Sequence, residues 1–151
     1  MDISPITDYL YVGSQPKVVY SEQLSAWGVR LVISMRGESR PHAVFSQPPF
    51  SLVWFRTYDT FLTPVPVRVL MEGVRAALPV IEAGGRVLVH CQQGKHRSVA
   101  MAAAILIARG YSAEAAMQLL RARRQIASPQ TRYVKRQIKK FERAWQTEKK
   151  A

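Results

Sequence analysis

The most constraining feature of the sequence is a short polar loop held between two apolar segments. Val87, Leu88 and Val89 predict a buried strand, and residues 98–108 predict an apolar helix that ends at Gly110. Between them runs the polar stretch HCQQGKHR, residues 90–97. A strand that leads through a tight loop into a helix brings backbone N–H groups to the positive end of the helix dipole. The arrangement therefore predicts an anion site inside an α/β fold.

Strand-like and helix-like segments alternate along the rest of the chain. This alternation predicts an α/β fold with a central, mostly parallel sheet flanked by helices. A length of 151 residues with 48% hydrophobic residues is typical of one domain, so we expect a single domain over residues 1–151. In the last helix, we expect Ser128 as N-cap and Pro129 in the first helical position. We expect the other strands at 9–12, 31–33 and 52–55, a polar loop at 36–49, and helices at 21–27, 67–82, 112–123 and about 129–146.

The sequence predicts a soluble protein without cofactors. It has no stretch of eighteen or more apolar residues, and its first residues lack the pattern of a secretory signal. Cys91 is the only cysteine, so it has no partner for an internal disulfide or for a cysteine zinc site. We therefore expect a cytoplasmic monomer that needs no metal and no organic cofactor.

Most of the positive charge is concentrated near the C-terminus. Residues 121–150 hold eleven Lys and Arg residues and two Glu, which accounts for nine of the twelve units of net positive charge. In the last predicted helix the basic residues share one face and the apolar residues share the other. This basic face indicates either a contact with an anionic surface or a solvated helix face that keeps the protein soluble.

The polar loop has the residues needed to bind a phosphate group and to attack it. Its glycine lets the backbone curl, and the guanidinium of Arg97 can bind two phosphate oxygens at once. The same positive surroundings favour a thiolate at Cys91, and the hydroxyl of Ser98 can donate a hydrogen bond to that sulfur. The expected phosphate-binding residues are Gln92, Gln93, Gly94, Lys95, His96 and Arg97.

A phosphate transfer from an alcohol or phenol also needs a proton donor. The chain has three aspartates, and Asp59 is the only one outside the first ten residues. It lies in a loop directly after a predicted buried strand, where a loop movement could bring it over a bound substrate. Asp59 alone would be read as a turn residue, but its pairing with the cysteine loop indicates a general acid.

The motif HCQQGKHRS resembles the pattern H-C-x5-R-S/T of the protein tyrosine phosphatase superfamily, and the chain looks most like the small dual-specificity branch. The opening ITDYLYVGS and the segment RARRQIASPQ are also similar to this branch, and Asp59 precedes Cys91 by 32 residues, as the general acid of the family does. The resemblance implies the cysteine-phosphatase fold, with Cys91 as nucleophile, Arg97 as phosphate ligand and Asp59 as general acid and base. It also implies that Ser98 assists the thiolate and that His90 tunes the cysteine.

The resemblance leaves the substrate class open. The expected activity is hydrolysis of phosphotyrosine in proteins, with phosphoserine and phosphothreonine as further substrates. The chain is too short for the elements that deepen a phosphotyrosine pocket, and Thr57 and Tyr58 stand before the acid where larger relatives have Trp-Pro. Lys95 and His96 add positive charge to the loop, as in phosphoinositide phosphatases, so an inositol phosphate or phosphoinositide substrate is the alternative. A phosphate-binding module without turnover is the third reading.

Overall fold

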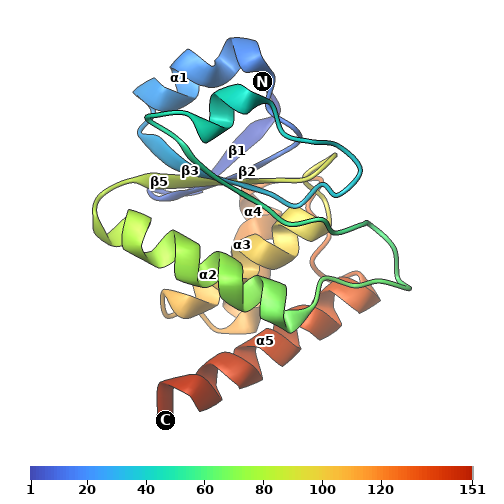
Figure 1. Ribbon diagram of the computed structural model, residues 1–151. Helices are drawn as coiled ribbons and strands as arrows, with labels where there is room; N and C mark the ends of the chain where they lie inside the picture. The colour runs from blue at the N-terminus through green and yellow to red at the C-terminus, as the bar shows by residue number, and fades with distance from the viewer. Residues whose placement is uncertain (151) are drawn as a thin grey trace.

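A five-stranded sheet forms the centre of the structure, a computed structural model that describes residues 1–150 (Figure 1). The strand order is β1-β2-β5-β3-β4. Only the pair β1 and β2 is antiparallel, and the other three pairs are parallel. This confirms the predicted α/β class with a mostly parallel sheet. The strands are β1 (Ile3–Thr7), β2 (Leu10–Gly13), β3 (Val29–Ser34), β4 (Ser51–Trp54) and β5 (Arg86–His90).

The strands are apolar on both sides because helical elements cover both faces of the sheet. In β3, Leu31 and Ile33 pack into the larger core, while Val32 between them packs into the smaller one. β5 divides in the same way, with Val87 and Val89 on one face and Leu88 on the other. A parallel strand that is buried on both faces reads as a continuous apolar run, which is why the sequence reveals these strands.

The helices are divided unequally between the two faces of the sheet (Figure 1). The short helix α1 (Ser21–Ala26) covers one face with the 3-10 helices Val18–Tyr20 and Ala43–Ser46. The other face holds α2 (Val67–Glu82), α3 (Arg97–Ala108), α4 (Ala113–Arg123) and α5 (Arg132–Lys150).

Helix α3 lies at the centre of this larger layer and packs against α2, α4 and α5. Its residues from Arg97 to Ile107 are all buried. The alanines at 100, 102, 103 and 104 let neighbouring helices approach closely, because small side chains leave room for ridges from the partner helices. The start of α3, where the polar loop ends, is therefore fixed by packing on several sides.

Several predicted boundaries are confirmed. Helix α2 covers residues 67–82 as expected and continues through Pro79. Ser112 caps α4, since its side chain accepts a hydrogen bond from the N–H of Ala115 at 3.1 Å. Strand β1 was not expected. It pairs with β2 at the sheet edge, where its residues are mostly half-buried and therefore lack a strong apolar pattern.

The predicted start of the last helix is wrong. Helix α5 begins at Arg132, three residues after Pro129, and continues to Lys150. Ser128 is not its N-cap, because its hydroxyl donates to the carbonyl of Ile126 at 3.2 Å. The N–H of Ser128 instead donates to the carbonyl of Lys95 at 3.0 Å. Residues 128–131 form a separate turn, in which the Thr131 N–H donates to the Ser128 carbonyl at 3.2 Å, and this turn is fastened to the polar loop.

None of the helices within residues 1–150 combines the length and the apolar character needed to cross a bilayer.

Candidate active site

The polar loop joins the C-terminal end of β5 to the first residue of α3. Cys91 is the first loop residue after β5. The Cys91 side chain is 3% exposed, so the thiol lies at the bottom of the loop. Its Sγ atom is 3.2 Å from the Ser98 hydroxyl oxygen and accepts a hydrogen bond from the Gly94 N–H, also at 3.2 Å. The loop therefore wraps around the sulfur and directs donors at it.

These donors favour the thiolate. Burial by itself raises the pKa of the Cys91 thiol, because a charged sulfur loses solvation. Hydrogen bonds from the Ser98 hydroxyl and from the backbone N–H groups of Ser98, Lys95 and Gly94 outweigh burial, and the net effect lowers the pKa. A thiolate can only accept hydrogen bonds, so Ser98 is the donor when Cys91 is ionised.

Gly94 is needed for this curl of the loop. Its φ of +68° lies in the left-handed region, and a Cβ atom there would come within 2.6 Å of Arg124 Nη2 and 2.7 Å of the Gly13 carbonyl oxygen. Arg124, itself buried, holds the outer side of the loop: its Nε donates to the Gly94 carbonyl at 2.8 Å and its Nη2 to the Gln93 carbonyl at 2.6 Å. Asp2 pairs with the same guanidinium at 3.0 Å.

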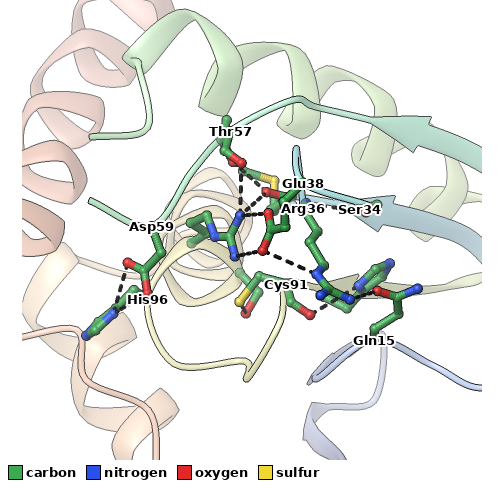
Figure 2. A network of polar contacts seen from close by, with 12 residues as sticks. Gln15, Ser34, Arg36, Glu38, Thr57, Asp59, Cys91 and His96 are labelled. Atoms are coloured by element: carbon green, nitrogen blue, oxygen red, sulfur yellow. Dashed lines mark hydrogen bonds and ion pairs between the residues drawn. The ribbon is translucent and has the colours of Figure 1, made fainter. Parts of the chain in front are cut away.

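Glu38 holds the guanidinium of Arg97 from the side of the loop after β3 (Figure 2). Arg97 Nη1 and Nη2 donate to the two carboxylate oxygens of Glu38 at 2.8 and 3.0 Å. Nη1 also donates to the carbonyls of Thr57 at 2.9 Å and Met35 at 3.2 Å. The hydrogen bonds from Arg97 lower the pKa of Glu38 to about 2, against the opposing effect of burial.

Arg97 keeps N–H donors free for a ligand, because Nη2 has two N–H groups and among residues 1–150 contacts only Glu38. Its Nε atom is buried and has no hydrogen-bond partner among the described residues. A buried donor without a partner is costly unless a ligand satisfies it. The residues present thus fit a phosphate group in the loop, which would supply acceptor oxygens to Arg97 and to the backbone N–H groups.

Asp59 lies on the loop between β4 and α2, and its carboxylate faces His96 (Figure 2). His96 Nδ1 is 3.1 Å from Asp59 Oδ1 and 3.0 Å from Oδ2. The Tyr133 hydroxyl donates to Oδ1 at 2.7 Å. Partial burial raises the pKa of Asp59, but the hydrogen bonds from His96 and Tyr133 and the charges of His96 and Arg97 lower it overall.

The same contacts affect Tyr133. Burial and the hydrogen bond to the Asp59 carboxylate raise the pKa of Tyr133 to about 12, so the phenol stays protonated and remains a donor at neutral pH.

The other predicted site residues take different positions. His90 is buried, and burial lowers its pKa to about 4, so it is neutral at physiological pH. Its Nδ1 lies 3.4 Å from the Cys91 carbonyl oxygen, a contact with the backbone of the cysteine. The side chains of Gln92 and Gln93 are exposed, and Lys95 is half-buried. The structure thus brings Cys91, Arg97, Ser98, Asp59 and His96 together, while their roles in a reaction stay predictions.

Sequence reasoning missed several residues of this site. Glu38 lies in a loop that we expected only to be polar, and Tyr133 lies in the first turn of a helix that we expected to start earlier. Neither stands at a fixed spacing from Cys91, so the sequence holds no signal for them. Arg124 lies within the segment RARRQIASPQ that carried part of the resemblance, and this was the one available signal for a residue of the site.

The sequence and the fold of this chain are similar to those of known proteins. A family model described as the dual specificity phosphatase catalytic domain matches residues 10–144. Dual specificity phosphatase 28 of Homo sapiens is 29% identical, with 92% of this chain and 77% of that protein covered. The crystal structure of human DUSP28 superposes with a TM-score of 0.85 at 25% identity, covering 97% of this chain and 96% of that chain.

A structure of PTPMT1 in complex with PI(5)P has the same fold, with a TM-score of 0.86 at 23% identity over 97% of each chain. The match of the family model spans nearly the whole described chain and includes every residue of the loop around Cys91. The chain belongs to the dual-specificity phosphatase catalytic domain family and is a phosphatase that hydrolyses phosphate monoesters.

Proposed function

We propose that this phosphatase works through a phosphocysteine intermediate on Cys91. The observation that carries the proposal is the set of donors around the Cys91 sulfur at the start of α3, which lowers the pKa of the thiol despite its burial. The free Nε donor of Arg97 in the same site supports a dianionic ligand. The loop would bind the phosphate and activate the attacking group with the same backbone.

In the first step, the Cys91 thiolate attacks phosphorus with an electron pair from sulfur, and the bond between phosphorus and the leaving oxygen breaks. The leaving oxygen takes that electron pair and the proton of the Asp59 carboxyl group. Arg97, held in place by Glu38, binds two of the remaining phosphate oxygens. The products of the step are the free alcohol or phenol and a phosphorylated cysteine.

The contacts of Asp59 favour its carboxylate form, because His96 and Tyr133 both direct donors at it. A bound phosphate dianion beside Asp59 opposes a second negative charge and so raises the pKa of the carboxyl group. Substrate binding therefore promotes the protonated form that the first step requires, and loss of the leaving group returns Asp59 toward the carboxylate.

In the second step, water attacks phosphorus and the phosphorus–sulfur bond breaks. The Asp59 carboxylate takes a proton from the water, and the sulfur leaves with its electron pair. The Ser98 hydroxyl, 3.2 Å from Sγ, donates a hydrogen bond to the departing thiolate. Inorganic phosphate is released, and both Cys91 and Asp59 have the protonation states needed for the next cycle.

For the substrate, we propose phosphotyrosine in proteins first, with phosphoserine and phosphothreonine as further substrates. The family assignment supports a dual-specificity protein phosphatase. The alternative is a phosphoinositide or inositol phosphate. It is supported by the solved structure of PTPMT1, a protein of the same fold that holds PI(5)P, and by the half-buried Lys95 in the loop.

We also propose that one chain is sufficient and that the protein works in a reducing compartment such as the cytoplasm. Every contact of the site described above comes from a single chain. Cys91 is a free thiol with no second cysteine to protect it by a disulfide, so an oxidising environment would convert it to higher oxidation states.

The test is hydrolysis of para-nitrophenyl phosphate as a function of pH by the wild type, Cys91→Ser and Asp59→Ala. We expect no turnover in Cys91→Ser. In Asp59→Ala we expect a lower kcat that no longer falls steeply at high pH, because the general acid whose ionisation causes that fall is missing. Wild-type turnover in Cys91→Ser would refute the covalent mechanism. A wild type that binds phosphopeptide without turnover would identify a binding module.

Turnover of a phosphotyrosine peptide and of a soluble phosphoinositide, measured side by side, separates the two substrate classes. A higher kcat/KM on the peptide supports the protein substrate, and a higher value on the phosphoinositide supports the alternative.

A further inference from the structure

The loop that holds Asp59 has large apolar side chains in solvent. Phe61 is 70% exposed and Leu62 is 75% exposed, and both follow Asp59 within three residues. Tyr58, on the other side of the aspartate, is 51% exposed. An exposed group of large apolar side chains on one short segment commonly marks a surface that contacts another apolar phase.

Helix α5 has an exposed line of positive charge. Arg132, Arg136, Lys140 and Arg143 follow one another at intervals of four, four and three residues, so they form one stripe along the helix. All four are exposed, and none lies within ion-pair distance of a carboxylate in residues 1–150. Lys139 beside the stripe differs, because it pairs with Glu114 at 3.1 Å. We call these four residues the basic stripe.

The basic stripe is held rigidly outward. The opposite face of α5 buries Val134, Ile138 and Phe141 in the main core. The stripe runs over twelve residues of the helix, from Arg132 to Arg143, which is roughly 16 Å at the usual rise per residue. The cations therefore form a line of fixed spacing on the outer surface of the domain.

The exposed loop and the basic stripe meet beside the candidate active site. Phe61 lines a surface hollow together with Arg132, Tyr133 and Arg136. Tyr133 at this junction is also the residue that donates to Asp59 at 2.7 Å. Figure 1 shows the loop between β4 and α2 reaching out beside the first turn of α5. Phe61, the first two arginines of the basic stripe and the residue that holds the Asp59 carboxylate thus lie next to one another.

We propose that Phe61, Leu62 and the basic stripe dock this domain on an anionic lipid bilayer. The two apolar side chains enter the interface between headgroups and acyl chains, and the stripe lies along the anionic headgroups. Charge complementarity points to an anionic partner, and the exposed Phe61 and Leu62 distinguish a bilayer from a soluble polyanion. A polyanion satisfies the arginines and the lysine but offers no apolar phase for a leucine.

Docking in this way has a consequence for the substrate, and that consequence rests on the proposed function. The hollow lined by Phe61 adjoins Tyr133 and Asp59, so a docked domain holds its candidate active site beside the membrane surface. Phosphate monoesters on lipid headgroups, or on proteins bound to the same membrane, are then the substrates within reach. Binding itself requires no turnover and can be measured independently of it.

The experiment is sedimentation of the full chain with two kinds of vesicle: phosphatidylcholine alone, and phosphatidylcholine mixed with phosphatidylserine. We expect binding only to the vesicles that contain phosphatidylserine, weakened by added salt. The double variant Arg136→Gln/Lys140→Gln should bind about 25-fold more weakly, since each basic residue near such a surface contributes about fivefold. Arg121→Gln/Arg123→Gln on α4 removes the same charge outside the stripe and is the matched control, with binding close to that of the wild type.

The apolar part of the proposal is tested by Phe61→Ser/Leu62→Ser, which leaves every charge in place. We expect weaker vesicle binding but unchanged binding to heparin, a soluble polyanion. Vesicle binding that survives this change would overturn the bilayer proposal and leave a general polyanion surface. Equal losses in the stripe variant and in the α4 control would overturn the role of the stripe.

Turnover of para-nitrophenyl phosphate by the wild type, measured beside its vesicle binding, separates this inference from the proposed function. Normal turnover with no vesicle binding in the wild type would refute docking alone. Vesicle binding by a wild type without turnover would refute the proposed chemistry and leave the docking surface supported.

Discussion

His96 Nδ1 lies within 3.1 Å of both carboxylate oxygens of Asp59, although the two residues are 37 positions apart in the sequence. An ionised carboxylate can only accept hydrogen bonds, so Nδ1 bears the hydrogen between them. The candidate general acid is therefore tied directly to the residue before Arg97 in the phosphate loop. This contact links the protonation of Asp59 to the state of that loop.

Replacement of His96 should change the pH dependence of turnover. In His96→Ala, Asp59 keeps its partial burial but loses a hydrogen bond and a positive charge that lower its pKa. The pKa of Asp59 should rise, so the decline of kcat at high pH should move to higher pH. The pH profile of para-nitrophenyl phosphate hydrolysis measures this shift. His42→Ala, which removes an exposed histidine from the loop after β3, is the matched control. An unchanged profile in His96→Ala would refute the coupling.

Replacement of Glu38 should misplace Arg97. Glu38→Gln keeps the size of the side chain but loses the charge and one of the two acceptor oxygens that hold the guanidinium at 2.8 and 3.0 Å. We expect kcat/KM for para-nitrophenyl phosphate to fall by up to about 100-fold, the size that a small misplacement of a catalytic group can cause. Glu22→Gln on α1 makes the same change away from the site. Wild-type kcat/KM in Glu38→Gln would show that Glu38 does not position Arg97.

Acid should destabilise the fold in two pH windows. His90 is buried and neutral, and its pKa falls from 6.5 to about 4, so the unfolded state binds its proton first. The contribution of neutral His90 to the free energy of unfolding is fully present above pH 6.5 and is lost as the pH falls toward about 4. The pKa of Glu38 falls from 4.5 to about 2, so its contribution is present above 4.5 and is lost on the way to about 2.

Urea unfolding at a series of pH values measures both windows. The Glu38 contribution should be about 1 kcal/mol, because its side chain is 33% exposed and solvent screens the pair. Glu38→Gln should reduce the loss in the lower window and leave the upper one, because Asp2 and Asp59, whose pKa values are also lowered, still contribute to the loss at low pH. A wild-type stability that stays constant between pH 6.5 and 2 would contradict both assignments.

A Cβ atom at Gly94 should damage the phosphate loop. Gly94→Ala places a side chain at a φ of +68° and within 2.7 Å of the Gly13 carbonyl. Gly84→Ala is a matched control, because Gly84 has a φ of +89° but no atom within 4 Å of the added Cβ. The control should lose only about 1–2 kcal/mol of stability with normal turnover. Gly94→Ala should lose more stability and most activity; equal effects in both variants would mean that close packing around the loop is unimportant.

Residues with strong local patterns were predicted well. Helix α2 has the expected bounds because its apolar residues recur at helical spacing and glycines follow its end. The strands β3 and β5 were recognised because they are apolar on both faces. The predicted start of α5 was wrong, since Ser128 and Pro129 resemble a helix start but belong to a turn before the helix, which the Ser128 N–H fastens to the carbonyl of Lys95. A local signal cannot report a contact with a residue 33 positions away.

The fold class and the loop around Cys91 could be predicted from the order of residues alone, because both depend on short-range order: a strand, a glycine-containing turn and a helix in succession. Cys91, Arg97 and Ser98 lie within eight residues of one another, so the local conformation of the loop is enough to bring them together. The residues that surround this loop became known only from the packing of the folded chain. Three contacts form only when distant elements pack together: Glu38 with Arg97, Tyr133 and His96 with Asp59, and Arg124 with the Gly94 carbonyl. Hydrogen bonds of about 3 Å depend on folded geometry, and residue spacing does not encode that geometry.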